Sequence, residues 1–254
     1  MQVPEERVPG EVCRGRPCPA VGNRVKRPPT KVGGQPGAPG YPPRLRSTII
    51  DGRGQRRHYK YAMALKLVIF DLDGTLLEAM LDFGAVRAEI GLPPVTPILE
   101  AIAALSDTEQ TRARAILDRH EAAVAERSCL MPGARELLVH LRERGVKVAV
   151  LTRNSRASVD LAIRRHGLAF DASVARDEHR PKPSPDGVHY LMAACGAAAD
   201  ETIVVGDYRF DIEAGRSAGV RTIALVSEPK PWARDATWVA SSLLDVQRLL
   251  DAAF

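Results

Sequence analysis

The chain has 254 residues, enough for one large domain or two small ones with a well-filled core. Its net charge of +5 is uneven, because residues 1–62 hold 13 basic and 4 acidic residues (+9) and residues 63–254 hold 23 and 27 (−4). The basic balance is therefore no argument that the folded domain binds nucleic acid. No apolar run reaches the roughly 18 residues of a membrane span. The four cysteines are too few for a disulfide scaffold, so we expect a cytoplasmic protein with reduced thiols, and nothing indicates its oligomeric state.

Residues 1–62 differ in composition from the rest of the chain. They contain 10 of the 19 Pro and 9 of the 20 Gly, and they show no sustained apolar period. We interpret them as a disordered basic tail and expect the folded domain over residues 63–254. A transit peptide is the alternative, since Arg is frequent and acids are few, but ten prolines argue against an amphipathic targeting helix.

The first strand-like run, over residues 66–71, ends in Asp71-Leu72-Asp73-Gly74-Thr75. Residues i and i+2 of a strand share a face, so Asp71 and Asp73 leave the strand end close together. Open α/β sheets bind ligands at the carboxyl ends of their strands. Two neighbouring acids repel unless a cation lies between them, and hard oxygen ligands suit Mg²⁺. The alternative is an ordinary Asp-Gly turn.

The stretch 79–130 is too long for a single crossover helix. Its apolar periodicity predicts helices over 83–90, 96–105 and 108–127, with Ser106-Asp107 as a start signal for the third. We interpret this stretch as a small helical cap inserted over the ligand-binding edge of the sheet. Its candidate contacts for an anionic substrate, among which the sequence does not select, are Arg87, Arg112 and Arg119.

A second strand-like run, over 147–151, ends at Thr152, and Ser155 is a plausible N-cap for the next helix. A hydroxyl and backbone N–H groups at a strand end can hold phosphate oxygens. Arg153 is a further candidate substrate contact. Thr is also an ordinary strand-end residue, so this segment alone is weak evidence.

Lys182 lies between Pro181 and Pro183. Two prolines disfavour a helix and restrict the backbone, so the loop suits a fixed cation near an anionic group. The alternative is a solvated lysine before a helix.

A third buried run, over 202–206, ends at Asp207, and Asp211 follows four residues later at the start of a helix. The i, i+4 spacing puts both acids near one face of that helix. The alternative is that these acids only stabilise the helix N-terminus.

Strands and helices alternate through the rest of the domain. This order predicts an α/β fold, a doubly wound parallel sheet with helices on both faces, and it brings the strand ends to one edge. The further expected strands are 170–174, 221–226 and 237–240, and the further helices are 133–144, 155–166, 185–195, 209–218 and 241–252.

The ordered set of Asp71 and Asp73, Thr152, Lys182, then Asp207 and Asp211 resembles the motifs of the haloacid dehalogenase-like superfamily over about residues 66–254. Most members of this superfamily are Mg²⁺-dependent phosphatases. The resemblance implies a Rossmann-like core with a helical cap that supplies much of the substrate selection. The chain resembles in particular the phosphoglycolate phosphatases with a small helical cap.

The resemblance also implies roles for individual residues. Asp71 would be the nucleophile that forms an aspartyl-phosphate, and Asp73 the general acid and base. Mg²⁺ would be held by Asp71, the Asp73 backbone carbonyl and Asp207, with Asp211 orienting the metal site. Thr152 and Lys182 would bind the phosphoryl oxygens.

The expected function is therefore a Mg²⁺-dependent phosphatase acting on a small phosphorylated metabolite, with phosphoglycolate as the first candidate by resemblance. An acid at position 73 favours phosphate chemistry over the dehalogenase branch. The alternatives are a phosphomutase of the same fold and a non-catalytic binding or regulatory protein that retains the fold.

Overall fold

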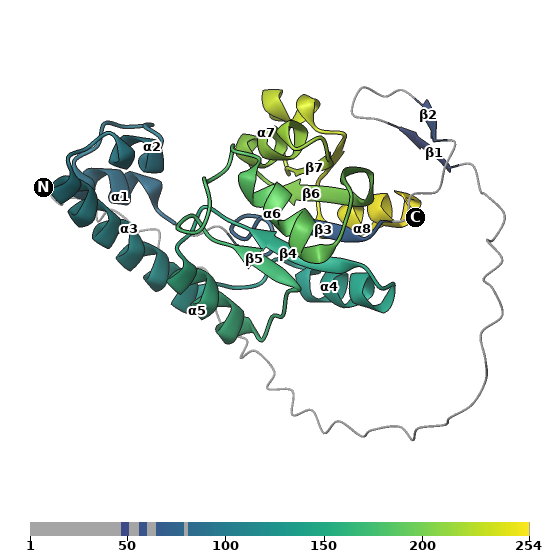
Figure 1. Cartoon of the computed structure of the whole chain (residues 1–254), viewed down its shortest axis with the longest axis horizontal. Helices are drawn as coiled ribbons and strands as arrows, with labels where there is room; N and C mark the ends of the chain where they lie inside the picture. The colour runs from purple at the N-terminus through teal and green to yellow at the C-terminus, as the bar shows by residue number, and fades with distance from the viewer. Residues whose placement is uncertain (1–46, 51–55, 60–64, 79–80, 254) are drawn as a thin grey trace, which may run out of the picture. The chain divides into compact units, whose positions relative to one another are not determined.

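The computed structural model describes residues 47–50, 56–59, 65–78 and 81–253. Its main sheet has six parallel strands in the order β5-β4-β3-β6-β7-β8 (Figure 1). The expected doubly wound parallel α/β sheet is therefore confirmed. The strands are β3 (Leu67–Phe70), β4 (Lys147–Leu151), β5 (Ala172–Val174), β6 (Thr202–Gly206), β7 (Arg221–Leu225) and β8 (Trp238–Ala240).

Strand β3 lies between β4 and β6, and its pairing with them shows where the polar residues after the three strands emerge. Phe70 lies opposite Val150 of β4 and Val205 of β6. Asp71 comes one residue after Phe70, and Thr152 and Asp207 come two residues after its partners. Because all three strands run in the same direction, these polar residues emerge together at the carboxyl edge of the sheet.

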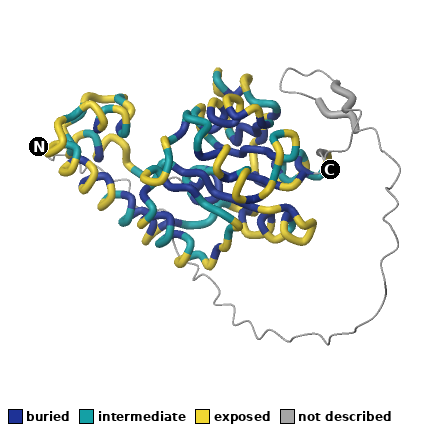
Figure 2. The backbone as a smooth tube through the Cα atoms, in the orientation of Figure 1, coloured by how far each residue is buried: buried dark blue, intermediate teal, exposed yellow. Residues whose placement is uncertain are grey.

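Helices cover both faces of the sheet, and the side chains of β3 alternate between them. Val68 and Phe70 pack in one cluster against α4, α5 and α8, and Leu67 and Ile69 in another against α6 and α7. In Figure 2 the strands form the buried centre between helices with exposed outer faces. These helices are α4 (Ala134–Glu143), α5 (Arg156–His166), α6 (Asp186–Cys195), α7 (Arg209–Ser217) and α8 (Leu243–Ala253), with short 3-10 turns η1 (Ala199–Glu201) and η2 (Pro231–Asp235).

Three helices lie between β3 and α4, as the periodicity predicts: α1 (Phe83–Ile90), α2 (Ile98–Ala103) and α3 (Asp107–Arg127). Ser106 and Glu109 form a capping box at the start of α3. The three helices share a small apolar core of their own. Its buried residues are Val86, Ile98, Ile102, Ala113 and Leu117.

The two connections between cap and core run side by side. Leu77 and Leu130 form an antiparallel bridge, and the Met131 N–H donates to the Leu76 carbonyl at 2.9 Å. Beyond this junction α3 packs along α5 (Figure 1), and Val124 and Ala125 near its end are buried. The last part of α3 is therefore packed on the core, although the sequence predicted a separate cap throughout residues 79–130.

One sequence prediction is corrected at the N-terminal side. Residues 47–50 and 56–59, expected to lack regular structure, form two antiparallel strands, β1 (Ser47–Ile50) and β2 (Arg56–Tyr59). The run Ser-Thr-Ile-Ile has high β-propensity, which the proline-rich composition of the whole segment concealed. The rest of the predicted tail and its boundary at residue 62 lie outside the described residues. Within those residues, no helix is both long and apolar enough to cross a membrane.

Candidate functional site

Three carboxylates meet at the carboxyl edge of the sheet. Asp71 follows β3, Asp207 follows β6, and Asp211 lies in the first turn of α7. Oxygen atoms from all three lie within 4.8 Å of one another. Asp211 is buried, and its Oδ2 accepts a hydrogen bond from the Tyr208 N–H at 3.0 Å, which fixes it at the start of the helix.

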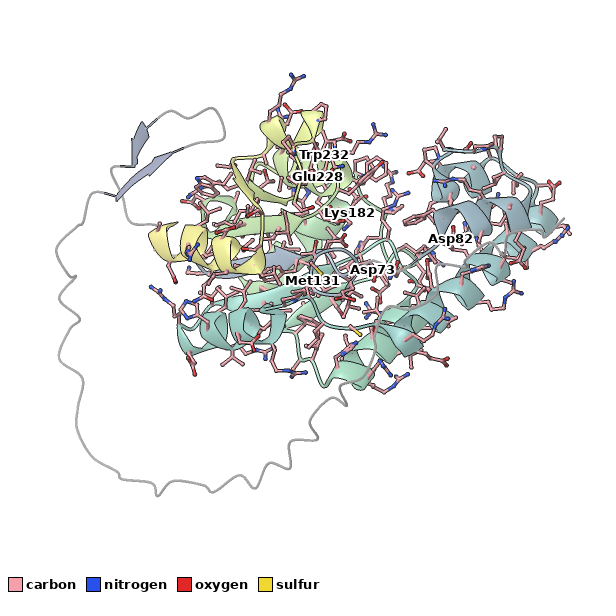
Figure 3. All side chains as sticks on the ribbon, turned by 180° about the vertical axis from the view of Figure 1, so that it is seen from behind. Asp73, Asp82, Met131, Lys182, Glu228 and Trp232 are labelled. Carbon is pink, nitrogen blue, oxygen red and sulfur yellow. The ribbon has the colours of Figure 1, made fainter. Side chains whose placement is uncertain are left out.

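Lys182, which is labelled in Figure 3, supplies a cation to this cluster. Its Nζ lies 2.6 Å from Asp71 Oδ1 and 2.5 Å from Asp211 Oδ1, and the lysine is only 2% exposed. Burial by itself lowers the pKa of the ammonium, but the two carboxylates outweigh it, and the pKa of Lys182 is raised. The lysine is therefore charged and fixed in place.

The cluster keeps an excess of negative charge. When all three carboxylates are ionised, they and the ammonium give −3 + 1 = −2. Burial, followed by repulsion from Asp71 and Asp211, raises the pKa of Asp207 to about 8. Burial likewise raises the pKa of Asp211 to about 6. This hard oxygen set fits a divalent cation such as Mg²⁺, which would neutralise the excess charge.

Two glycines make the close approach of these carboxylates possible. Gly74 has φ +77°, and a Cβ there would lie 2.2 Å from Asp207 Oδ2. A Cβ at Gly206 would lie 2.2 Å from Cγ of Asp211. Gly74 was readable from the sequence as a turn residue, but its contact with Asp207 was not.

Asp73 lies beside this cluster, and its side chain has a different partner. Its Oδ2 accepts a hydrogen bond from Asn154 Nδ2 at 2.6 Å. Burial raises the pKa of Asp73 to about 6, the Asn154 hydrogen bond opposes this rise, and Asp71 adds to it. The Asp73 side chain is not one of the three clustered carboxylates, and the resemblance implies a metal contact through the Asp73 backbone carbonyl instead. Asn154 was missed, although it is a polar residue two positions beyond the strand-end Thr152.

Thr152 lies at the same edge and is buried. Its Oγ1 accepts a hydrogen bond from the Asn154 N–H at 3.2 Å. Ser155 caps α5 by accepting from the Ser158 N–H, as the sequence predicted. A strand-end hydroxyl and a helix N-terminus therefore lie together where an anion can bind.

A buried acid from the cap, Glu121 of α3, also reaches this region. It accepts hydrogen bonds from the N–H and Oγ of Ser155 at 3.0 and 3.1 Å. The Arg176 guanidinium forms ion pairs with both Glu121 and Asp118. No sequence motif pointed to this group, because its members come from three distant segments.

A cavity of about 350 Å³ lies over the site and is lined by core and cap residues. Of the four predicted substrate contacts, Arg87 and Arg153 line it. Arg112 and Arg119 lie at exposed positions of α3 outside the lining, and Arg119 pairs with Glu89. The buried face of α3 is the one that carries Leu117, and the sequence alone did not orient it. Asp71, Asp73, Thr152, Lys182, Asp207 and Asp211 all belong to the lining.

Comparison with known proteins agrees with this fold. The haloacid dehalogenase-like hydrolase family matches residues 65–219, and the chain belongs to this family. An N-acetylmuramic acid 6-phosphate phosphatase from Pseudomonas aeruginosa is 31% identical, over 74% of this chain and 94% of that protein. A phosphoglycolate phosphatase from Pseudomonas syringae is 30% identical, over 63% of this chain and 69% of that protein. The crystal structure of a hydrolase from Pseudomonas syringae has a TM-score of 0.65 at 23% identity, over 74% of this chain and 98% of the other.

Proposed function

We propose that this protein is a Mg²⁺-dependent phosphomonoesterase that hydrolyses a small phosphorylated metabolite through a phosphoryl group carried on Asp71. The observation that carries the proposal is the cluster of Asp71, Asp207 and Asp211, which keeps an excess charge of −2 when all three are ionised, although Lys182 pairs with two of them. An excess of two negative charges next to a cavity suits one divalent cation, which would offset the repulsion that a phosphate ester would otherwise meet there.

In the proposed reaction, Asp71 attacks phosphorus and the alcohol departs. Lys182 and Thr152 donate hydrogen bonds to the phosphoryl oxygens, which stabilises the charge that develops on them. A Mg²⁺ ion held by Asp71, the Asp73 carbonyl and Asp207, with Asp211 orienting the site, would neutralise the phosphate charge. Lys182 is already oriented by its two ion pairs, so little reorganisation accompanies substrate binding.

Asp73 is the proposed acid and base. It protonates the departing alcohol oxygen and then takes a proton from the water that attacks the phosphoryl-Asp71. Burial raises its pKa to about 6, which is suitable for both roles near neutral pH. Asn154 holds the carboxyl in position through its 2.6 Å hydrogen bond.

The substrate candidates come from the relatives. Their names include phosphoglycolate phosphatase and N-acetylmuramic acid 6-phosphate phosphatase, whose substrates differ greatly in size. We include both compounds among the substrates to be tested. We further propose a cytoplasmic location and no nucleic-acid partner for the folded domain, whose net charge from residue 63 onward is −4.

The test is release of inorganic phosphate from a panel of phosphorylated metabolites by the purified protein. We expect turnover with Mg²⁺, loss of turnover in excess chelator, and its return when Mg²⁺ is added back. Asp71→Asn should lower kcat by at least about 1000-fold with an unchanged circular dichroism spectrum. Full activity in excess chelator, or an active Asp71→Asn variant, would overturn the proposal.

The same panel separates the alternative functions. A phosphomutase would yield an isomeric phosphate ester with little free phosphate. A non-catalytic binding protein would bind an ester without releasing any.

A further inference from the structure

The cap side of the cavity is mainly apolar. Of the nine lining residues between positions 81 and 121, seven are apolar, and the other two are Arg87 and Glu121. The charged groups of the core therefore face an apolar wall, against which the leaving group of a substrate would lie.

The two polar side chains on the cap side, Arg87 and Glu121, already have protein partners. Arg87 donates from Nε to the Thr96 carbonyl at 2.8 Å and from Nη1 to the Phe83 carbonyl at 3.1 Å. Glu121 accepts from Ser155 and pairs with Arg176. A polyhydroxylated leaving group would bury hydroxyls against apolar side chains, which costs free energy when their hydrogen bonds to water are not replaced.

Val95 is the strongest individual observation. It is the one non-glycine residue with a positive φ among the described residues, at 58°, and its side chain is 89% exposed. A β-branched residue is strained in this conformation, which glycine or asparagine adopts more readily. An exposed valine that lines a cavity at such a position is not explained by local folding or by core packing.

Two further exposed apolar side chains line the cavity with Val95. Phe83 of α1 is 53% exposed, and Tyr208, at the start of α7, is 49% exposed. Tyr208 packs edge-on against Phe210 with ring centroids 5.1 Å apart, which restrains its ring. We call Phe83, Val95 and Tyr208 the apolar rim.

We propose that the apolar rim binds an apolar ring in the leaving group of the phosphomonoester substrate. This inference rests on the proposed function, because it places the phosphate at Asp71 and the ring at the rim. The cavity volume of about 350 Å³ is near the lower end of those that hold drug-sized ligands. The two-carbon acid of phosphoglycolate would leave most of the apolar wall without contact, so we expect it to be a poor substrate.

The test compares benzyl phosphate with ethyl phosphate, both of which release an alkyl alcohol of similar acidity. We expect kcat/KM to be at least about tenfold higher for benzyl phosphate, because the rim gains apolar burial. The ratio of the two kcat/KM values should fall by about three- to tenfold in Phe83→Ala, Val95→Asn and Tyr208→Ser, each of which removes part of the rim. The matched control is Val139→Ser, an exposed valine on α4 outside the cavity lining, which should leave the ratio unchanged.

Binding provides a second readout that needs no turnover. With Mg²⁺ present, benzylphosphonate should bind more tightly than ethylphosphonate by calorimetry, and the three rim variants should lose this preference. The melting temperature of Val95→Asn should not fall, since asparagine tolerates the positive φ. Equal binding of the two phosphonates, or a preference that survives all three variants, would overturn the inference. Hydrolysis of ethyl phosphate without a preference for benzyl phosphate would overturn the ring-binding inference and leave the proposed function standing. Failure to hydrolyse any ester would reject the proposed function.

Discussion

Nη2 of Arg153, on the core, lies 2.9 and 2.8 Å from the two carboxylate oxygens of Glu100, on the cap helix α2. The same guanidinium donates to the Lys182 carbonyl and lies over the Phe210 ring, 4.6 Å from its centroid. A single side chain therefore joins the cap to the loop that carries the proposed phosphate-binding lysine.

We expect Glu100→Gln to raise KM by about two- to fivefold with little change in melting temperature. A partly exposed ion pair contributes only about 0.2–1 kcal/mol, so its loss should loosen the cap without affecting the core. Steady-state kinetics at low salt measures the effect, and added salt should reduce the difference. Glu126→Gln, an exposed acid elsewhere on α3, is the matched control. Identical KM values for Glu100→Gln and the parent protein would contradict a role for this pair.

Arg176→Met should lower the free energy of unfolding by about 3–5 kcal/mol, because it leaves the buried Glu121 without its cation. Urea denaturation measures this loss. Arg248→Met is the matched control, since its pair with Asp245 is one helical turn away on an exposed surface and should contribute under about 0.5 kcal/mol. Equal losses in the two variants would show that Arg176 and Glu121 are not coupled as the geometry implies.

Gly74→Ala and Gly91→Ala test the approach of Asp207 to the turn. Both glycines have positive φ, so each substitution should cost about 1–2 kcal/mol in stability. A Cβ at Gly74 would also lie 2.2 Å from Asp207 Oδ2, whereas a Cβ at Gly91 would meet nothing within 4 Å. We therefore expect Gly74→Ala to raise the Mg²⁺ concentration needed for half-maximal activity by at least about tenfold, and Gly91→Ala to leave it unchanged. A Gly74→Ala enzyme with normal Mg²⁺ dependence would contradict the proposed role of Asp207.

Asn154→Ala should shift the pH dependence of kcat/KM for an alkyl phosphate. Burial raises the pKa of Asp73 to about 6, and the Asn154 hydrogen bond stabilises the ionised form and thus opposes that rise. Without this bond the pKa of Asp73 rises further. Because the acid must be protonated to act on the leaving oxygen, the decline of activity at high pH should move to higher pH. A decline that stays in place or moves to lower pH would remove Asp73 from the acid role.

The sheet and its edge could be predicted because their signals are local. Apolar runs of four or five residues mark β3, β4 and β6, and each ends in a polar residue that the parallel register then brings to one edge. Asp71, Thr152 and Asp207 therefore follow from short-range pattern and topology alone. The periodicity of α1 and α3 was equally local.

The rest depends on contacts between distant segments. Glu121 reaches the site only because α3 packs along α5, and Arg176 joins it from beyond β5. The same packing decides which face of α3 is exposed, and it places Arg112 and Arg119 on the exposed face, outside the cavity lining. Asn154 acquires its role from a side chain 81 positions earlier in the chain.

The attachment of α3 determines how the entrance of the cavity can move. Its C-terminal part is fixed by the Glu121–Arg176 pair, whereas its N-terminal part carries α1 and α2. The helix is therefore held most firmly at one end, with about 20 Å between Glu121 and its first residue. A tilt of about 10° at that end would displace the other end by about 4 Å. Because the Glu100–Arg153 pair joins α2 to the core, a tilt that widens the entrance would break this partly exposed pair, at a cost of about 0.2–1 kcal/mol.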